Sequence, residues 1–280
     1  MNILAAFKQS KLTWIGLGIL VLFGLCAMLA PLIAPHDPWE FGRTPFADPS
    51  HDHLLGTNDV GQDIFSELLY GARTSLLVGF AAGFVAVSVG TIIGLATGFR
   101  RGFLDEILMG LTDVFLVIPA LPLIILVSVY LGASTWNVVL IIGLVFWPNT
   151  ARVIRSQVLS IRESGYVESA RAMGAGDLWV MGRHVLPNVL PLIMAKFVLT
   201  VAVAMLMEAS LSFLGLGDPV SKSWGMMLHY AFERGGFIRE LWWWYMPPGL
   251  AIALCILALM LISFSLEEQS DPRLKRALER

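Results

Sequence analysis

The chain contains 280 residues, of which 56% are hydrophobic and only 14% are charged, and its mean hydropathy is +0.73. Soluble domains carry about 25% charged residues, so this composition excludes an ordinary soluble domain and predicts a polytopic membrane protein of the all-α class. The net charge of −2 gives no indication of a nucleic-acid partner.

Long uncharged stretches mark the candidate membrane spans, because a spanning helix needs roughly 20 apolar residues. Four stretches contain no charged side chain: residues 12–35, 74–99, 114–151 and 241–266. The third would extend about 57 Å as one helix at about 1.5 Å per residue, far more than the bilayer core of about 30 Å. It must therefore turn, and residues 132–137 (GASTWN) provide turn-forming residues.

A further apolar run, residues 189–217, is interrupted only by Lys196 and Glu208. Six spans are therefore predicted, near residues 13–34, 74–99, 107–131, 137–152, 188–214 and 246–266. Pro119, Pro122 and Pro148 are expected to break the third and fourth helices locally, although proline is also common in spanning helices.

The distribution of basic residues predicts the orientation, because cytoplasmic loops are enriched in Lys and Arg. With six spans, both termini lie on the same side of the membrane. The basic residues on that side are Lys8, Lys11, Arg100, Arg101, Arg152, Arg155, Arg162, Arg171, Arg183, Arg273, Lys275, Arg276 and Arg280. The other side has Arg43, Arg73, Lys222, Arg234 and Arg239. Both termini are therefore predicted to be cytoplasmic.

The chain is expected to have two parts. Residues 1–71 would form an N-terminal transmembrane helix and an extracytoplasmic loop, and residues 72–280 a five-helix core with a cytoplasmic loop at 153–187. A second extracytoplasmic segment is expected at 215–245, where Trp242–Tyr245 would anchor the last span at the outer interface.

Two short helices are predicted inside the cytoplasmic loop. Residues 166–173 are good helix formers followed by Gly174, which fits a left-handed C-cap. Tyr166, Ala170 and Met173 would then share one face. Asp177 is a candidate N-cap for a second helix over 178–185, ended by Pro187. The alternative for this segment is an amphipathic helix lying on the inner leaflet.

This loop resembles the cytoplasmic "EAA" loop of the permease subunits of bacterial ABC importers. Glu168, Ala170, Gly174, Leu186 and Pro187 match its pattern, whereas Ser169 and His184 depart from it. The resemblance implies that the segment couples the permease to an ATPase. The residues to which it assigns this coupling are Tyr166, Glu168, Ser169, Ala170, Arg171, Met173, Gly174, Leu186 and Pro187.

Further elements resemble the peptide/nickel permease branch of these importers, in particular the second subunit of the permease pair. They are Ala34–Pro38, Leu55–Thr57, Glu208 with Leu211–Gly217, Ser223–Gly225, Pro247–Gly249 and Asp271–Arg273. The branch usually has Asp where this chain has Asn58, and Arg where it has Gln62 and Glu67. These departures leave the transported solute open.

The resemblance implies a non-catalytic subunit of a type I importer in a bacterial or archaeal cytoplasmic membrane. Its expected partners are a second permease, two ATP-binding subunits that carry ATP-Mg, and an extracytoplasmic solute-binding protein. No cofactor is expected on this chain, which has no phosphate-binding Gly-x-x-x-x-Gly-Lys motif. Di- or oligopeptides are the leading solutes, with nickel or a metal-chelate as the alternative. A different class, an ion-coupled carrier acting alone, would require polar groups converging at mid-membrane.

Few ionisable residues fall within the predicted spans, where such groups are costly and face a protein interior or water. Glu208 and Asp113 are candidate residues of the translocation path. For both, and for Lys196, a structural role is the alternative.

His51 and His53, together with His36, suggest a metal site in the first outer loop, because imidazole suits nickel and zinc. A turn-rich polar loop is the alternative interpretation, and no metal ligand is assigned.

Overall fold

The computed structural model describes residues 11–270. Within that range the secondary structure consists of helices, apart from one isolated β-bridge between Thr57 and Asp63. This confirms the all-α class. The terminal Asp271–Arg273 element and the basic residues Lys8, Arg273, Lys275, Arg276 and Arg280 lie outside the described residues.

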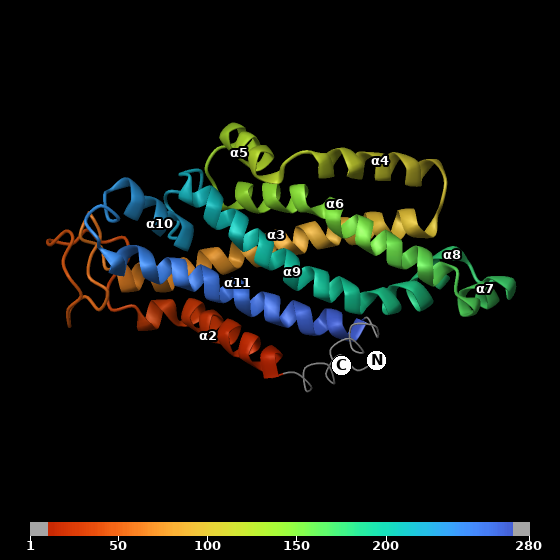
Figure 1. The fold of residues 1–280 in the computed structure, drawn as a ribbon, viewed down its shortest axis with the longest axis horizontal. Coiled ribbons are helices and arrows are strands. Elements are labelled where there is room, and N and C mark those ends of the chain that lie inside the picture. The colour runs from red at the N-terminus through yellow and green to blue at the C-terminus, as the bar shows by residue number, and fades with distance from the viewer. Residues whose placement is uncertain (1–10, 271–280) are drawn as a thin grey trace.

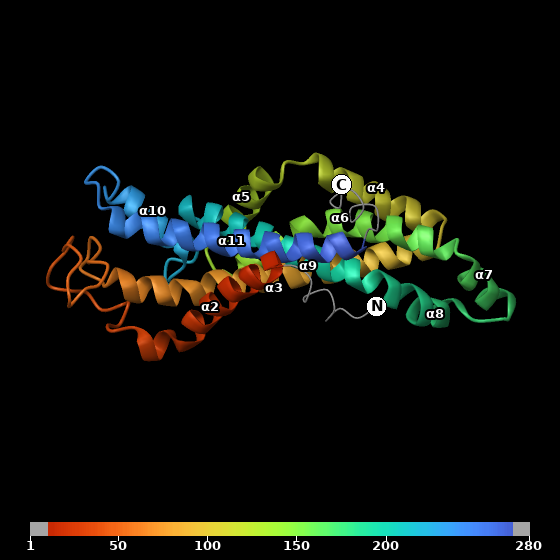
Figure 2. The same ribbon diagram turned by 60° about the horizontal axis from the view of Figure 1, so that its bottom comes forward.

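Five long helices form an elongated bundle (Figure 1). They are α2 (Lys11–Ile33), α3 (Ile64–Phe99), α6 (Thr135–Arg162), α9 (Leu186–Phe213) and α11 (Trp242–Ser270). Helix α3 packs along α6 and α9, while α11 packs against α9 and α2. Figures 1 and 2 show α2 on one side of the bundle, with α4 (Phe103–Val117) and α5 (Ala120–Leu131) on the other.

The number of membrane spans agrees with the prediction when α4 and α5 are counted together. Among the described residues, five helices are long and apolar enough to cross a membrane, and the α4–α5 pair makes a sixth. The local break expected at Pro119 in the third span is confirmed, because this pair is bent by 92° at Ile118 and Pro119. Proline has no backbone N–H and disfavours helical geometry in the preceding residue, which explains the break. The break expected at Pro148 is wrong, because Pro148 lies inside the continuous α6.

Glycines on α3 allow the bundle to pack closely. A Cβ on Gly94 would lie 2.7 Å from the carbonyl oxygen of Ala151, and a Cβ on Gly90 would lie 2.6 Å from that of Trp147. Gly83 similarly faces Val201 of α9. Small residues of this kind let helix backbones approach each other in membranes, where packing is a principal source of helix association.

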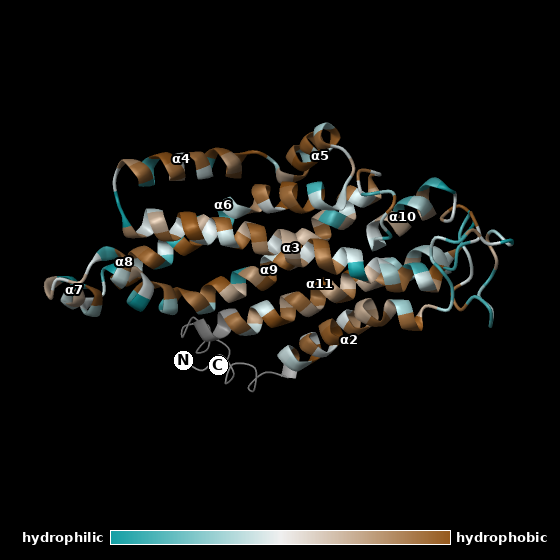
Figure 3. Cartoon of the chain, turned by 180° about the vertical axis from the view of Figure 1, so that it is seen from behind, coloured by the Kyte–Doolittle hydropathy of each residue, from teal (hydrophilic) through white to brown (hydrophobic). Residues whose placement is uncertain are grey.

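The two ends of the bundle differ. The loop at 34–63 and α10 (Trp224–Glu233) gather at one end, and α7 (Gly165–Ala172) and α8 (Asp177–Val180) project at the other (Figure 1). Hydrophilic residues concentrate towards these ends and apolar residues cover the middle (Figure 3). The segment 215–245 is more than a loop, because α10 buries Trp224 and Met227 in the core. Trp244 is also buried, whereas Trp242 is exposed as expected for an interfacial anchor.

Candidate ATPase-coupling helix and outer vestibule

Helix α7 is the element that the sequence assigns to ATPase coupling, and it ends in a Schellman motif. Gly174 has φ of +89°, the left-handed conformation predicted for it. The Gly174 N–H donates to the carbonyl of Arg171, and the Ala175 N–H donates to that of Ala170. These two bonds satisfy carbonyls that would otherwise have no partner at the end of the helix.

One side of α7 is fixed to the bundle. Val167 and Ala170 are buried in a cluster with Phe99 of α3 and Val158 of α6. The guanidinium of Arg171 lies over the Phe99 ring, 4.7 Å from its centroid, and 3.6 Å from Asp177. A force applied to α7 would therefore be transmitted directly to the ends of α3 and α6.

The other side of α7 faces outwards. Tyr166, Glu168, Ser169 and Met173 are exposed, and Met173 is 82% accessible. Tyr166, Ala170 and Met173 were expected on one face of the helix. Ala170 is buried, so these three residues do not form one exposed surface. No ion pair to Glu168 occurs within residues 11–270.

Residues 178–185 are helical as predicted, but the predicted end of this second helix at Pro187 is wrong. Helix α8 continues through a π-helical turn at Met181–Val185 into α9, so Leu186 and Pro187 lie inside a continuous helical segment. The Leu186 N–H donates to the Met181 carbonyl, five residues back. In a regular α-helix each residue donates its backbone N–H to the carbonyl four residues back, and proline has no N–H to donate. The wider π turn before Pro187 departs from this α-helical bonding pattern, so the helix continues past the proline. Gly176, rather than Asp177, is the N-cap of α8.

Exposed aromatic and apolar residues extend the surface beside α7. His184 lies between Tyr166 and Trp179, with ring centroids 5.9 Å and 5.2 Å away. Leu178 and Trp179 are 73% and 56% exposed. These two residues are not among the predicted coupling residues, although large apolar side chains in a short polar segment are a usable signal of a contact surface.

At the opposite end, Glu208 lies in a buried polar cluster. Its side chain is nearly inaccessible and accepts hydrogen bonds from Ser212 Oγ at 2.8 Å and Ser75 Oγ at 3.4 Å. It also lines a small cavity together with Thr74 and Ser221. The predicted path residue is therefore buried within this chain in the conformation described.

Two outward depressions lie beside this cavity, with volumes of about 290 and 350 Å³. Both are lined by Arg73, Thr74 and Ser221, so the small cavity and the two depressions share Thr74 and Ser221. We call these depressions and the cavity the outer vestibule. Asp218 also lines it, and although burial raises the pKa of Asp218, hydrogen bonds from Val220, Thr135 and Ser221 hold it below its ordinary value.

Asn58, Gln62 and Glu67, which depart from the pattern of the peptide/nickel permease branch, form one hydrogen-bond network at the edge of the vestibule. Lys222 Nζ lies 2.5 Å from Glu67 Oε1 and 2.8 Å from Gln62 Oε1. Asn58 Nδ2 donates to the same two oxygens. Glu67 and Asn58 are buried, so Lys222 compensates the carboxylate that stands where the branch usually has Arg.

Asp113, the other candidate path residue, forms an ion pair with Arg152. A second pair, Asp105 with Arg155, has two hydrogen bonds of 2.7 and 2.8 Å. Both pairs join α4 to α6. Lys196 is half-buried on α9.

The bundle and its apolar middle (Figure 3) define the chain as a multi-pass membrane protein. Residues 90–276 match the family described as binding-protein-dependent transport system inner membrane component. Residues 2–54 match the N-terminal TM domain of oligopeptide transport permease C. The chain belongs to the binding-protein-dependent inner membrane component family, whose members are non-catalytic permease subunits of ABC importers.

Similar proteins cover nearly the whole chain. It is 37% identical to a putative peptide transport system permease protein of Brucella suis over 263 residues, and this match covers 93% of this chain and 88% of the relative. It is 34% identical over 273 residues to the oligopeptide transport system permease protein OppC of Bacillus subtilis (96% and 88%). For the dipeptide transport system permease protein DppC of Haemophilus influenzae, the identity is 36% over 278 residues (96% and 93%).

The fold also resembles a solved structure. An inward-facing form of the MetNI methionine ABC transporter superposes with a TM-score of 0.57, covering 78% of this chain and 98% of that chain at 20% identity. At that identity the likeness concerns the fold alone. The family and the apolar helices together make the chain a multi-pass inner membrane protein that works with ATP-binding subunits and a permease partner.

Proposed function

We propose that this chain and a second, similar permease form the path by which di- or oligopeptides enter the cell, driven by two separate ATP-binding subunits. The observation that carries the mechanism is the geometry of α7, which is exposed on one side and packed on the ends of α3 and α6 on the other. The peptide assignment rests on the relatives named as oligopeptide and dipeptide permeases.

In this mechanism the ATP-binding subunits take hold of the exposed side of α7, including Glu168 and Met173, and of the adjacent Leu178 and Trp179. Their closure on ATP moves α7, and the buried side chain of Val167 and the contact of Arg171 with the Phe99 ring transmit the movement to the bundle. The path then switches between inward and outward access. This chain performs no covalent chemistry.

At the opposite end, an extracytoplasmic binding protein delivers solute to the segments 36–71 and 215–245, which surround the outer vestibule. Arg73, Lys222 and Asp218 provide charges of both signs there, as recognition of a zwitterionic peptide requires. Both termini lie in the cytoplasm in this arrangement. Glu208 is placed at the outer end of the path and Asp113 near its inner end.

Reconstitution of the complete complex in proteoliposomes tests this proposal. Uptake of a labelled di- or oligopeptide should require ATP and the binding protein and should stop with vanadate. Nickel uptake without peptide uptake would overturn the solute assignment, and uptake independent of ATP would overturn the mechanism.

A further inference from the structure

We propose that His36, His53 and Asp63 form a binding site for one divalent transition-metal ion, which fastens the outer loop to the start of α3. Their ligand atoms all lie within 4.8 Å of one another. The inference goes beyond the proposed function, because it concerns an ion that resides in the loop and not the transported solute.

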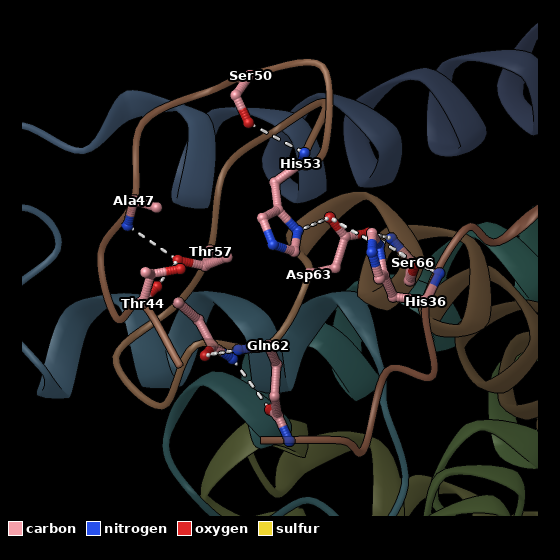
Figure 4. A network of polar contacts seen from close by, with 10 residues as sticks. His36, Thr44, Ala47, Ser50, His53, Thr57, Gln62, Asp63 and Ser66 are labelled. Atoms are coloured by element: carbon pink, nitrogen blue, oxygen red, sulfur yellow. Dashed lines mark hydrogen bonds and ion pairs between the residues drawn. The ribbon is translucent and has the colours of Figure 1, made fainter. Parts of the chain in front are cut away.

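The three residues come from separate parts of the first outer loop (Figure 4). His36 follows the end of α2 at Ile33, His53 lies in the middle of the loop, and Asp63 is the N-cap of α3. The fold thus brings together side chains that are up to 27 residues apart (63 − 36). An ion bound to all three would join α2, the loop and α3 at one point.

The distances between the ligand atoms suit a metal ion. His53 Nδ1 lies 3.0 Å and His36 Nδ1 lies 3.9 Å from Asp63 Oδ1. Zinc binds nitrogen and carboxylate oxygen at about 2.0–2.2 Å, which in a tetrahedral site separates the ligand atoms by about 3.3–3.5 Å. The observed distances bracket this value, so rotations of the two imidazoles would complete the site.

The carboxylate of Asp63 is already oriented for this role. Its side chain is fully buried, and Oδ2 accepts hydrogen bonds from Ser66 N at 2.8 Å and Ser66 Oγ at 2.6 Å. These bonds leave Oδ1 directed towards His53. Ser66 Oγ also accepts a hydrogen bond from the backbone N–H of His36. Outer hydrogen bonds of this kind hold metal ligands in position.

The donor set selects the type of ion. Two imidazole nitrogens and one carboxylate oxygen suit zinc, nickel or copper, whereas magnesium and calcium prefer oxygen ligands throughout. The His36 and His53 side chains are 41% and 22% exposed, so water can reach the site and occupy a fourth position.

Of the three histidines considered as a metal site from the sequence, the fold brings together His36 and His53. His51 is exposed and is not a member of the group, whereas His36 stacks against His53 with ring centroids 4.7 Å apart. Asp63 was not among the predicted metal ligands, and its role as a helix cap explains the residue without a metal. His51 therefore serves as a matched control from the same loop.

Zinc binding to the full-length chain tests the site. The protein is purified in detergent with an affinity tag free of histidine, stripped with a chelator and titrated with Zn²⁺ in equilibrium dialysis. We expect saturation at one ion per chain. His36→Ala and His53→Ala should each weaken binding at least about tenfold, and His51→Ala should bind like the wild type.

Two further measurements keep the test decisive if an alanine variant folds poorly. Asp63→Asn retains a good helix cap, so it should lose zinc affinity yet match the wild-type unfolding temperature in chelator. X-ray absorption of the zinc-loaded wild type should show imidazole ligands in the first coordination shell. Absence of saturable binding, or binding that persists in both His36→Ala and His53→Ala, would overturn the proposal.

Discussion

At the scale of single residues, Lys222 and Glu67 form a buried ion pair at the edge of the outer vestibule. Their side chains are 14% and 4% exposed. Removing one partner of a buried ion pair leaves an uncompensated charge and typically costs about 3–5 kcal/mol, whereas replacing both can be nearly neutral.

We therefore predict that Lys222→Met lowers the free energy of unfolding by about 3–5 kcal/mol, measured by thermal or denaturant unfolding in detergent. The double variant Lys222→Met with Glu67→Gln should recover most of this loss. If the single and double variants are equally unstable, the ion pair is not the cause.

Glu208 offers a second test at this scale. Its carboxylate lines the cavity that shares Thr74 and Ser221 with the outward depressions. Glu208→Gln removes the charge but keeps an acceptor for Ser212, so assembly should persist while peptide uptake falls. Ser210→Ala on the same helix, whose hydroxyl bonds only to the Leu206 carbonyl, is the control. Unchanged transport kinetics in Glu208→Gln would leave Glu208 with a structural role only.

At the scale of the elements, the close contact between α3 and α6 depends on glycine. A Cβ on Gly94 would meet the Ala151 backbone at 2.7 Å, and backbone cannot be displaced as a flexible side chain can. We predict that Gly94→Ala destabilises the bundle by about 1–3 kcal/mol. Gly110→Ala on α4 has no neighbouring atom within 4 Å and should be neutral. Equal unfolding temperatures for the two variants would contradict this packing account.

Most of the elements, though not all of their limits, could be predicted from the sequence. The uncharged runs predicted the long helices because lipid demands apolar length, and Gly174 predicted the end of α7 because few other residues adopt its conformation. Helix α3 begins ten residues before its expected start at residue 74, since Glu67 and Arg73 masked its first turns. Buried in the fold, Glu67 is neutralised by Lys222, a partner 155 residues away that no local pattern reveals.

The candidate site was predictable to a similar extent. The proposed coupling residues could be selected from the sequence because their spacing is local, but the burial of Ala170 depends on Phe99 and Val158 from other helices. Pro187 was interpreted as a helix terminator, whereas the π turn before it allows the helix to continue. The outer vestibule could not be foreseen, because it is assembled from α3, the start of α6 and the segment after α9.

At the scale of the whole molecule, the orientation in the membrane stays a prediction. The described basic residues Arg100, Arg101, Arg162 and Arg171 lie near α7, and Arg43, Arg234 and Arg239 belong to segments at the other end (Figure 1). A reporter fused after Arg280 should therefore be cytoplasmic, and a tag inserted at Asp48 should be accessible from outside. The reverse labelling would contradict the assigned orientation.

The central claim is that α7 couples this permease to ATP-binding subunits. Valine at Gly174 would have to adopt a φ of +89°, at a cost of about 1–3 kcal/mol, which should displace the exposed end of α7. Glu168→Lys reverses a charge on the proposed contact surface. Gly176→Val is the matched control, because Gly176 has φ of −69° and ψ of 152°, which suit valine, and open space around it.

The most direct measurement is solute-stimulated ATP hydrolysis by the reconstituted complex, with co-purification of the ATP-binding subunits measured on the same samples. Gly174→Val and Glu168→Lys should both lower hydrolysis and co-purification sharply, while Gly176→Val stays close to the wild type and all three variants still assemble with the second permease. Full ATPase association and hydrolysis in both Gly174→Val and Glu168→Lys would show that α7 is only a surface helix and would contradict the coupling mechanism.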